Sequence, residues 1–157
     1  MKLILVAAMA AFTIPCCAQM QSGAQVFSGK DVTSQLAALA QRAKASGSSG
    51  ATLADYKSHA IKFSVRAASG GAEVHAHYDD IFFVTEGKAT LVTGGTVENA
   101  KDGNDGETTG SGIQNGERQI IAKGDIVHIP AGVPHQLIVA PESEYSSIVI
   151  KVRESRY

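Results

Sequence analysis

The chain has 157 residues, with 14 basic and 15 acidic side chains and a formal net charge of −1. This length is typical of one domain with one hydrophobic core. The even charge balance argues against a nucleic-acid partner, because such partners require a basic surface. The sequence has no polybasic cluster or lipidation motif that would hold the folded protein on a membrane.

The first residues are typical of a secretory signal peptide. Lys2 supplies a positive charge, and the apolar run Leu3–Ile14 has the length of a signal-peptide core, too short to span a bilayer. We predict cleavage after Ala18, and therefore a secreted or periplasmic protein. No comparable apolar run follows, which disfavours a membrane anchor, and Cys16 and Cys17 lack the preceding small residue of a lipoprotein. Cleavage would remove both cysteines, so the mature chain would depend on its packed core or partly on a bound metal.

The segment 31–44 has the pattern of an amphipathic helix. Its apolar residues recur at i, i+4, i+7 and i+11 and would form one stripe, made of Val32, Leu36, Leu39 and Ala43. Asp31 is the predicted N-cap, and the glycines from Gly47 onward are predicted to end the helix. The pattern indicates a helix that packs on the outside of the domain.

From His59 onward the apolar period changes to two, which is typical of half-buried strands. The pattern predicts short strands at 61–65, 73–77, 81–85, 89–93, 119–122, 126–129, 136–139 and 145–152. Asp79-Asp80 and the turn Glu86-Gly87-Lys88 are predicted to interrupt them. Many short strands with such turns favour a sandwich or barrel over an α/β sheet.

The stretch 98–116 is polar and rich in Gly and Asp, but it does not fit a calcium-binding EF-hand loop. In Asp102–Glu107, the position that should carry Asp or Asn is Gly106, and the position that should carry Gly is Glu107. The stretch is therefore predicted to be an exposed mobile loop.

Two histidine-containing segments indicate a metal site. His75 and His77 stand at i and i+2 of a predicted strand, where side chains alternate, so both rings would lie on one face. Alone, this pair could equally be two unrelated surface histidines. His135 follows a Pro-x-Gly turn and could complete the site from a neighbouring strand. Imidazole is the commonest metal ligand, so the three rings predict a metal site in an all-β domain. His128 lacks such a context and is predicted to be a structural histidine.

These segments resemble the two motifs of the cupin family, whose members are small jelly-roll β-barrels. The first motif runs from a Gly through His-x-His and a Glu to a second Gly, and the residues similar to it are Gly70, His75, His77, Asp80 and Gly87. The second motif has a Gly, then Pro-x-Gly, His and Asn, and the residues at its positions are Gly124, Pro130, Gly132, His135 and, in place of Asn, Val139.

The resemblance covers about residues 61–152 and implies an all-β, cupin-type jelly-roll barrel with an N-terminal helix. The implied organisation is a signal peptide at 1–18, a helical N-terminal extension at 19–58 and a cupin barrel at 59–157. Because cupins are often dimers, the resemblance also implies a homodimer.

Asp80 departs from the cupin motif, since it replaces Glu and stands three residues after His77 instead of four or five. A shorter carboxylate can still ligate a metal if the strand bulges, or it can support the site from outside while water takes its place. The resemblance thus implies metal ligation by His75, His77, Asp80 and His135. Asp79 is the next candidate carboxylate, and Glu86 is expected to be solvated.

Three imidazoles and one carboxylate suit a divalent transition metal, and Mn, Fe, Ni, Cu and Zn all remain open. A site with three or four protein ligands leaves a position for water or substrate.

Two classes of function follow from this site. The first is a secreted metal-binding cupin that binds a small molecule or serves a sensing or storage role. The second is an enzyme, namely a metal-dependent dioxygenase, or an isomerase or lyase acting on a sugar or an organic acid. The fold hosts many functions. The sequence names no general base for isomerisation, although Tyr78 could donate a hydrogen bond to a bound ligand.

Overall fold

The computed structural model describes residues 23–154, so the predicted signal peptide and its cleavage site lie outside the described residues. One helix, α1 (Gly29–Ser46), precedes the strands. The strands are β1 (Ser48–Asp55), β2 (His59–Arg66), β3 (Ala72–His75), β4 (Tyr78–Thr93), β5 (Thr96–Glu98), β6 (Lys101–Asp102), β7 (Glu107–Gly110), β8 (Gly112–Gln114), β9 (Glu117–Ala122), β10 (Ile126–Ile129), β11 (His135–Ile138) and β12 (Tyr145–Arg153). A short 3-10 helix, η1 (Asn104–Gly106), lies between β6 and β7. No helix of the described part is long and apolar enough to cross a membrane.

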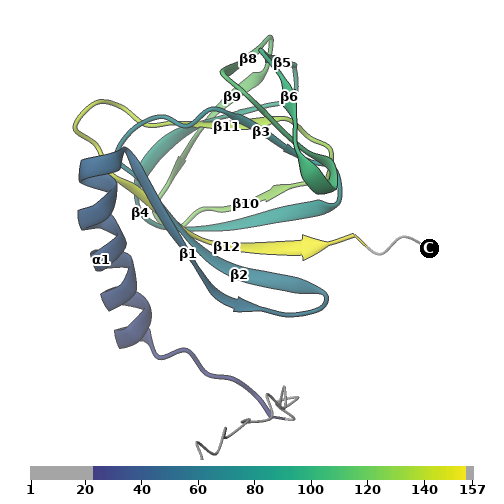
Figure 1. The fold of residues 1–157 in the computed structure, drawn as a ribbon. Coiled ribbons are helices and arrows are strands. Elements are labelled where there is room, and N and C mark those ends of the chain that lie inside the picture. Colours follow the sequence, from purple (N-terminus) through teal and green to yellow (C-terminus); the bar gives the residue numbers. More distant parts are fainter. Residues whose placement is uncertain (1–22, 155–157) are drawn as a thin grey trace, which may run out of the picture.

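Ten strands form one antiparallel sheet in the order β1-β2-β12-β4-β11-β3-β7-β6, with β9 and β10 also paired to β4. The sheet curls round on itself, so that β2, β12 and β10 form one side and β3 and β11 the other (Figure 1). β5 and β8 pair separately. The first half of β4 pairs with β12 and β10, and its second half with β11 and β9, so β4 joins the two sides. The prediction of an all-β fold with an N-terminal helix is confirmed.

β4 is one continuous strand of 16 residues, and the two predicted interruptions are wrong. Asp79 and Asp80 lie inside it and pair with β12. Farther along, Thr85 is an extra residue relative to β12, and Gly87 has a φ of 73°. The expected turn at Glu86-Gly87-Lys88 is thus a β-bulge, which bends β4 from one side of the barrel to the other.

Strands also occur in two segments where the sequence predicted none. β1 pairs along β2, although it lies in the stretch predicted as a helical extension. The stretch 98–116, predicted as a mobile loop, contains β6, β7 and β8, and β7 pairs with all four residues of β3. These polar segments are strands because they pair with neighbouring strands, and the local period of hydrophobicity does not reveal such pairing.

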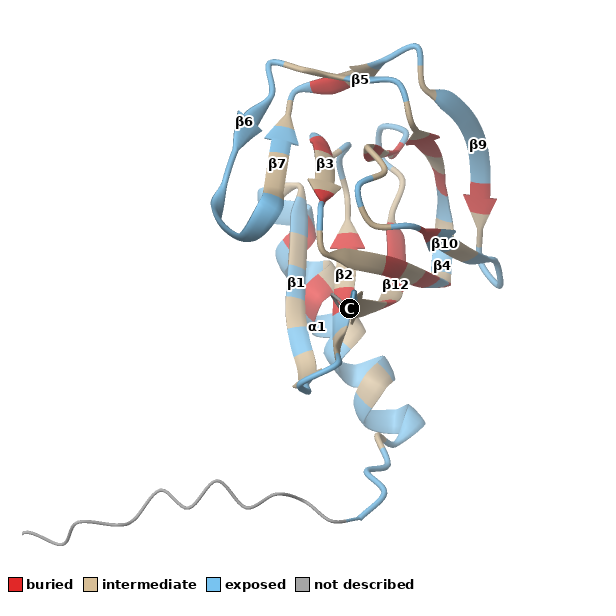
Figure 2. Cartoon of the chain, turned by 90° about the vertical axis from the view of Figure 1, so that its right-hand side faces the viewer, coloured by how far each residue is buried: buried red, intermediate tan, exposed pale blue. Residues whose placement is uncertain are grey.

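The predicted stripe on α1 packs against the outer face of β2. Leu39 and Ala43 are buried with Phe63 and Val65, while Val32 and Leu36 pack beside them. A second cluster fills the barrel; its members are Phe82, Val84, Ala89, Leu91, Ile121, Ile129, Leu137, Val139, Tyr145 and Val149. β6 and the first turns of α1 remain largely exposed (Figure 2).

Ser28, rather than the predicted Asp31, is the N-cap of α1. Its hydroxyl accepts a hydrogen bond from the backbone N–H of Asp31. We expect Ser28→Ala to lower the free energy of unfolding by about 1 kcal/mol, because that N–H loses its partner. Urea denaturation measures the change. The matched control is Ser34→Ala, an exposed mid-helix position where alanine should be neutral or slightly stabilising. Equal losses in both variants would contradict the cap.

Candidate metal centre

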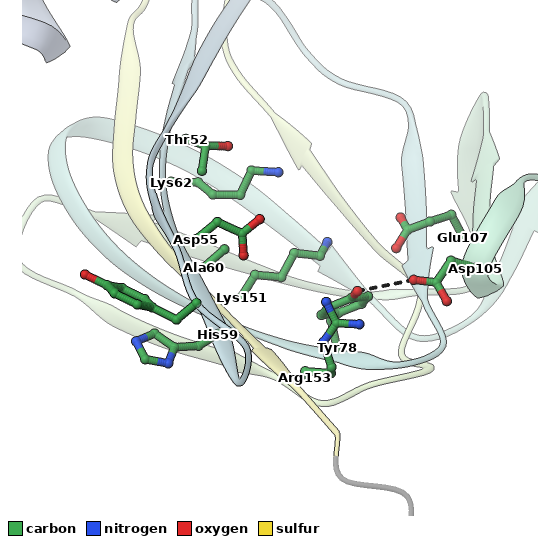
Figure 3. A pocket seen from close by; sticks show the side chains of 11 residues that line it. Thr52, Asp55, His59, Ala60, Lys62, Tyr78, Asp105, Glu107, Lys151 and Arg153 are labelled. Carbon is green, nitrogen blue, oxygen red and sulfur yellow. Dashed lines mark hydrogen bonds between the residues drawn. The ribbon is translucent and has the colours of Figure 1, made fainter. Parts of the chain in front are cut away.

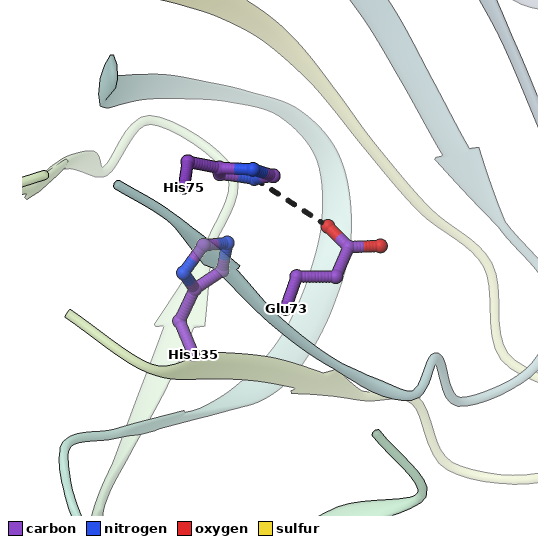
Figure 4. A group of neighbouring side chains, drawn as sticks. All are labelled: Glu73, His75 and His135. Carbon is purple, nitrogen blue, oxygen red and sulfur yellow. Dashed lines mark ion pairs between the residues drawn. The ribbon is translucent and has the colours of Figure 1, made fainter. Parts of the chain in front are cut away.

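One group among the described residues brings three potential ligand atoms within 4.8 Å of one another: Glu73, His75 and His135 (Figure 4). Glu73 and His75 are two residues apart on β3, so their side chains lie on the same face. His135 begins β11 directly opposite Glu73. The histidines are buried, with 8% of His75 and 5% of His135 exposed. The cluster therefore gathers two buried imidazoles and a carboxylate on the inner face of one side of the barrel.

Asp80 of β4 adds a second carboxylate to this cluster. It is 4% exposed, and its Oδ2 lies 3.4 Å from Nε2 of His75 and 3.8 Å from Nε2 of His135. Its Oδ1 is buried and has no hydrogen-bond partner in the described part of the chain. The nearest cation to Oδ1 is the Lys151 ammonium, at 3.8 Å. A buried carboxylate oxygen without a hydrogen bond is costly, and a metal ion bound by both oxygens of Asp80 would supply the missing partner.

His135 is held with its Nε2 free to coordinate. Its Nδ1 donates a hydrogen bond of 3.1 Å to the Val133 carbonyl, so the neutral ring carries its lone pair on Nε2. Burial lowers the pKa of His135 below its ordinary value, which favours this neutral form. The edge of Phe82 packs against the ring. These contacts aim Nε2 at Asp80.

The His75 ring is oriented in the same way, with Nδ1 as the hydrogen-bond donor, but here a carboxylate accepts the bond. Its Nδ1 donates to Glu107 of β7, leaving Nε2 toward Asp80 and Glu73. A carboxylate behind the ring is the usual way in which proteins orient a metal-binding histidine. Burial lowers the pKa of His75, but the neighbouring Asp80 and Glu107 carboxylates raise it by more, to above its ordinary value. A proton and a metal ion would therefore compete for Nε2 of His75.

The Pro-x-Gly turn ties the two histidine segments together. The backbone N–H of Gly132 donates to the His75 carbonyl at 2.9 Å, and Gly132 has a φ of 77°, which a glycine adopts without strain. Ala131 donates its N–H to Oδ1 of Asp79 at 2.8 Å. These hydrogen bonds place His135 beside His75, although 60 positions separate them in the sequence.

His77 does not join the cluster as the sequence analysis expected. β3 ends at His75, and Ala76-His77 form a turn. The argument that His75 and His77 share one strand face is therefore wrong, and the pair that does is Glu73 and His75. The His77 ring lies beside Gly106 of η1.

The same alternation rule, applied to the residue two positions before His75, would have found Glu73. Glu107 gave no such signal, because it stands in the polar stretch predicted as a loop.

The other candidate carboxylates face away from the cluster. Asp79 supports the turn at Ala131 and lies 3.4 Å from His128, which is a surface residue with 57% of its side chain exposed. Glu86 forms a surface ion pair with Lys123, as expected of a solvated residue.

The cluster faces a cavity of about 340 Å³. Its lining includes Glu73, His75 and His135 from the side of β3 and β11, and Asp80 with residues of β2 and β12 from the other side. Ligand atoms around one zinc ion lie about 3–3.5 Å apart, close to the 3.4 and 3.8 Å found here. The donor types, their spacing and the unpaired Asp80 oxygen fit a metal ion with room beside it for a small molecule.

Comparison with known proteins identifies the fold. No protein-family model matches the sequence, and no curated protein does. Among solved structures, an uncharacterised Klebsiella pneumoniae protein with a double-stranded beta-helix domain is 14% identical, with a TM-score of 0.58 over 83% of this chain and 91% of that one. The cupin domain of Schizosaccharomyces pombe Cnp3 is 12% identical, with a TM-score of 0.51 over 68% of this chain and 65% of that one.

The polyketide cyclase RemF of Streptomyces resistomycificus is 16% identical, with a TM-score of 0.50 over 69% of this chain and 66% of that one. The chain thus covers less than two thirds of the cyclase and of the Cnp3 domain. These similarities, together with the curled antiparallel sheet, show that the chain has the cupin-type double-stranded β-helix fold.

Proposed function

We propose that this protein binds a divalent transition metal in the barrel and presents it to a small molecule in the adjoining cavity. The observation that carries the proposal is the convergence of two buried Nε2 atoms, from His75 and His135, on a buried Asp80 with an unpaired oxygen. Glu73 completes the ligand set from the same face of β3.

Two imidazoles with carboxylates suit Mn, Fe, Ni, Cu or Zn. A bound ion would act as a Lewis acid toward a molecule in the cavity. Around it, Glu107 orients His75, the Val133 carbonyl orients His135, and the apolar Phe82 shields the pair.

A metal-dependent oxygenase is the second candidate. Two histidines and one carboxylate form the donor set of many non-haem iron oxygenases, which keep positions open for substrate and dioxygen. The cavity beside the cluster provides room for both. Oxygen uptake by the iron-loaded protein with catechols, flavonols and diketones tests this candidate, and no uptake with any of them would speak against it.

Elemental analysis of the purified protein tests the primary proposal. We expect about one transition-metal ion per chain, and we expect the chelated protein to take up one equivalent again in a titration. A protein that is purified without metal and takes up none would contradict the proposal.

Asp80→Asn should lower metal affinity by at least about tenfold, because the variant keeps the shape but loses the anionic ligand. Metal titration of the chelated variant measures this. Asp79→Asn is the matched control, since its side chain points outward and asparagine still offers an oxygen to the Ala131 N–H. We expect wild-type affinity in the control, and equal affinities in both variants would exclude Asp80 from the ligand set.

A further inference from the structure

The wall of the cavity formed by β2 and β12, opposite the two histidines, is basic. Because α1 covers the outer face of β2, the polar alternate residues of that strand, Lys62, Ser64 and Arg66, line the interior. Lys151 of neighbouring β12 lines it as well. Lys62 pairs with Val149, two residues before Lys151, so the two lysines are diagonal neighbours on the same face of the sheet.

Among the described residues, Lys151 and Arg66 have carboxylates nearby but no hydrogen bond to them. Lys151 Nζ is 3.8 Å from Asp80, and Nη2 of Arg66 is 3.8 Å from Glu73, both longer than a hydrogen bond. Nε of Arg66 is buried with no hydrogen-bond partner among the described residues. The carboxylates facing these cations are the proposed metal ligands, so a bound metal would leave Lys151 and Arg66 without counter-charge.

The charge balance of the lining supports the same conclusion. Its basic side chains, Lys62, Arg66 and Lys151, equal in number its acidic ones, Glu73, Asp80 and Glu107. A divalent metal therefore leaves the cavity with an excess of about two positive charges, at short range and partly desolvated, where charge matters most. Such a cavity favours an anion.

The rest of the lining indicates what kind of anion fits. Phe82, Leu137 and Val149 add apolar surface to the lining, so the space suits a carbon skeleton. A second cavity, of about 280 Å³, shares Lys62, Lys151 and Glu107 with the first. Figure 3 shows Lys151 beside Tyr78, whose hydroxyl donates to Asp105, and Lys62 farther along the same cavity. The lysines thus stand where the two cavities meet.

We propose that the ligand of this site is a small organic acid whose carboxylate binds Lys62 and Lys151 while its other end reaches the metal. This inference rests on the metal-binding function proposed above. An inorganic oxyanion would use the charge but not the apolar surface, so it is the alternative that the experiment must separate.

The experiment measures calorimetric binding of succinate, succinamide and inorganic phosphate to the zinc-loaded protein. Succinamide has nearly the same shape without charge, and phosphate has the charge without the carbon chain. We expect succinate to bind at least tenfold more tightly than either. We expect the double variant Lys62→Gln, Lys151→Gln to lose at least tenfold in succinate affinity while zinc affinity is not lowered, because the removed Lys151 charge repels the metal ion. Lys123→Gln, at an exposed lysine paired with Glu86, should behave as wild type.

Equal binding of succinamide or of phosphate, or unchanged succinate affinity in the double variant, would overturn this inference while leaving metal binding intact. Failure of zinc to bind to the wild-type protein would overturn both proposals together. The zinc titration therefore separates the two failures.

Discussion

His75→Ala is expected to lower metal affinity by at least about a hundredfold, the upper end of what the loss of a supporting residue alone causes. The substitution removes the ligand atom that lies nearest to Asp80 and also the ring that Glu107 orients. His135→Ala should have a comparable effect, because its Nε2 faces the same carboxylate. Metal titration of the chelated variants measures both losses, and circular dichroism checks that each variant is folded.

Two histidine controls make this result specific. His128→Ala should keep wild-type affinity, because that side chain lies on the surface beside Asp79. His77→Ala separates the two ligand sets. The cluster in the structure predicts a small effect, whereas the three-histidine arrangement expected from the sequence predicts a loss as large as that of His75→Ala. A large loss in His77→Ala would show that the turn rearranges to bring His77 to the metal.

Gly87→Ala is expected to destabilise the protein by about 3 kcal/mol or more. Its φ of 73° strains any residue with a Cβ, and a methyl group there would overlap the backbone carbonyl oxygen of Glu144. Because backbone cannot move aside as a flexible side chain can, the two costs add. Thermal denaturation should show a fall in the melting temperature of roughly 10 °C.

Gly94→Ala is the control that separates these two costs. Gly94 has a similar φ of 69°, but no heavy atom beyond its chain neighbours lies within 4 Å of the position of its Cβ. The free energy of unfolding of Gly94→Ala should therefore fall only by the cost of the backbone strain, about 1 kcal/mol. Equal losses in both variants would mean that the bulge in β4 relaxes around the added methyl group.

The elements predicted correctly have signals that are local in the sequence. The stripe from Val32 to Ala43 reports one buried helix face, and alternation along β10, β11 and β12 reports strands, because each pattern reflects the geometry of a single element. His75 could be chosen from its His-x-His spacing and His135 from the Pro-x-Gly turn before it. The fold class followed from the number of such strands and turns.

The ends and bends of strands were predicted less well. Asp79-Asp80 and Glu86-Gly87 have the composition of turns, yet pairing with β12 on one side and with β9 and β11 on the other keeps β4 continuous. By contrast, β3 ends at His75, where the backbone N–H of Gly132 donates a hydrogen bond to the His75 carbonyl. Hydrogen bonds to distant segments decide these points.

The sequence by itself predicted an all-β barrel with one covering helix, and a candidate metal site that includes His75 and His135, because periodicity and turn residues are properties of neighbouring positions. Only the tertiary structure decided which residues join those histidines: Glu73 and Asp80 enter the cluster, and Glu107 supports it from a segment that resembled a loop. Only the tertiary structure placed Lys62 and Arg66 in the lining of the cavity. Alternation divides a strand into two faces, but the helix packed on Phe63 and Val65 decides which of them faces inward.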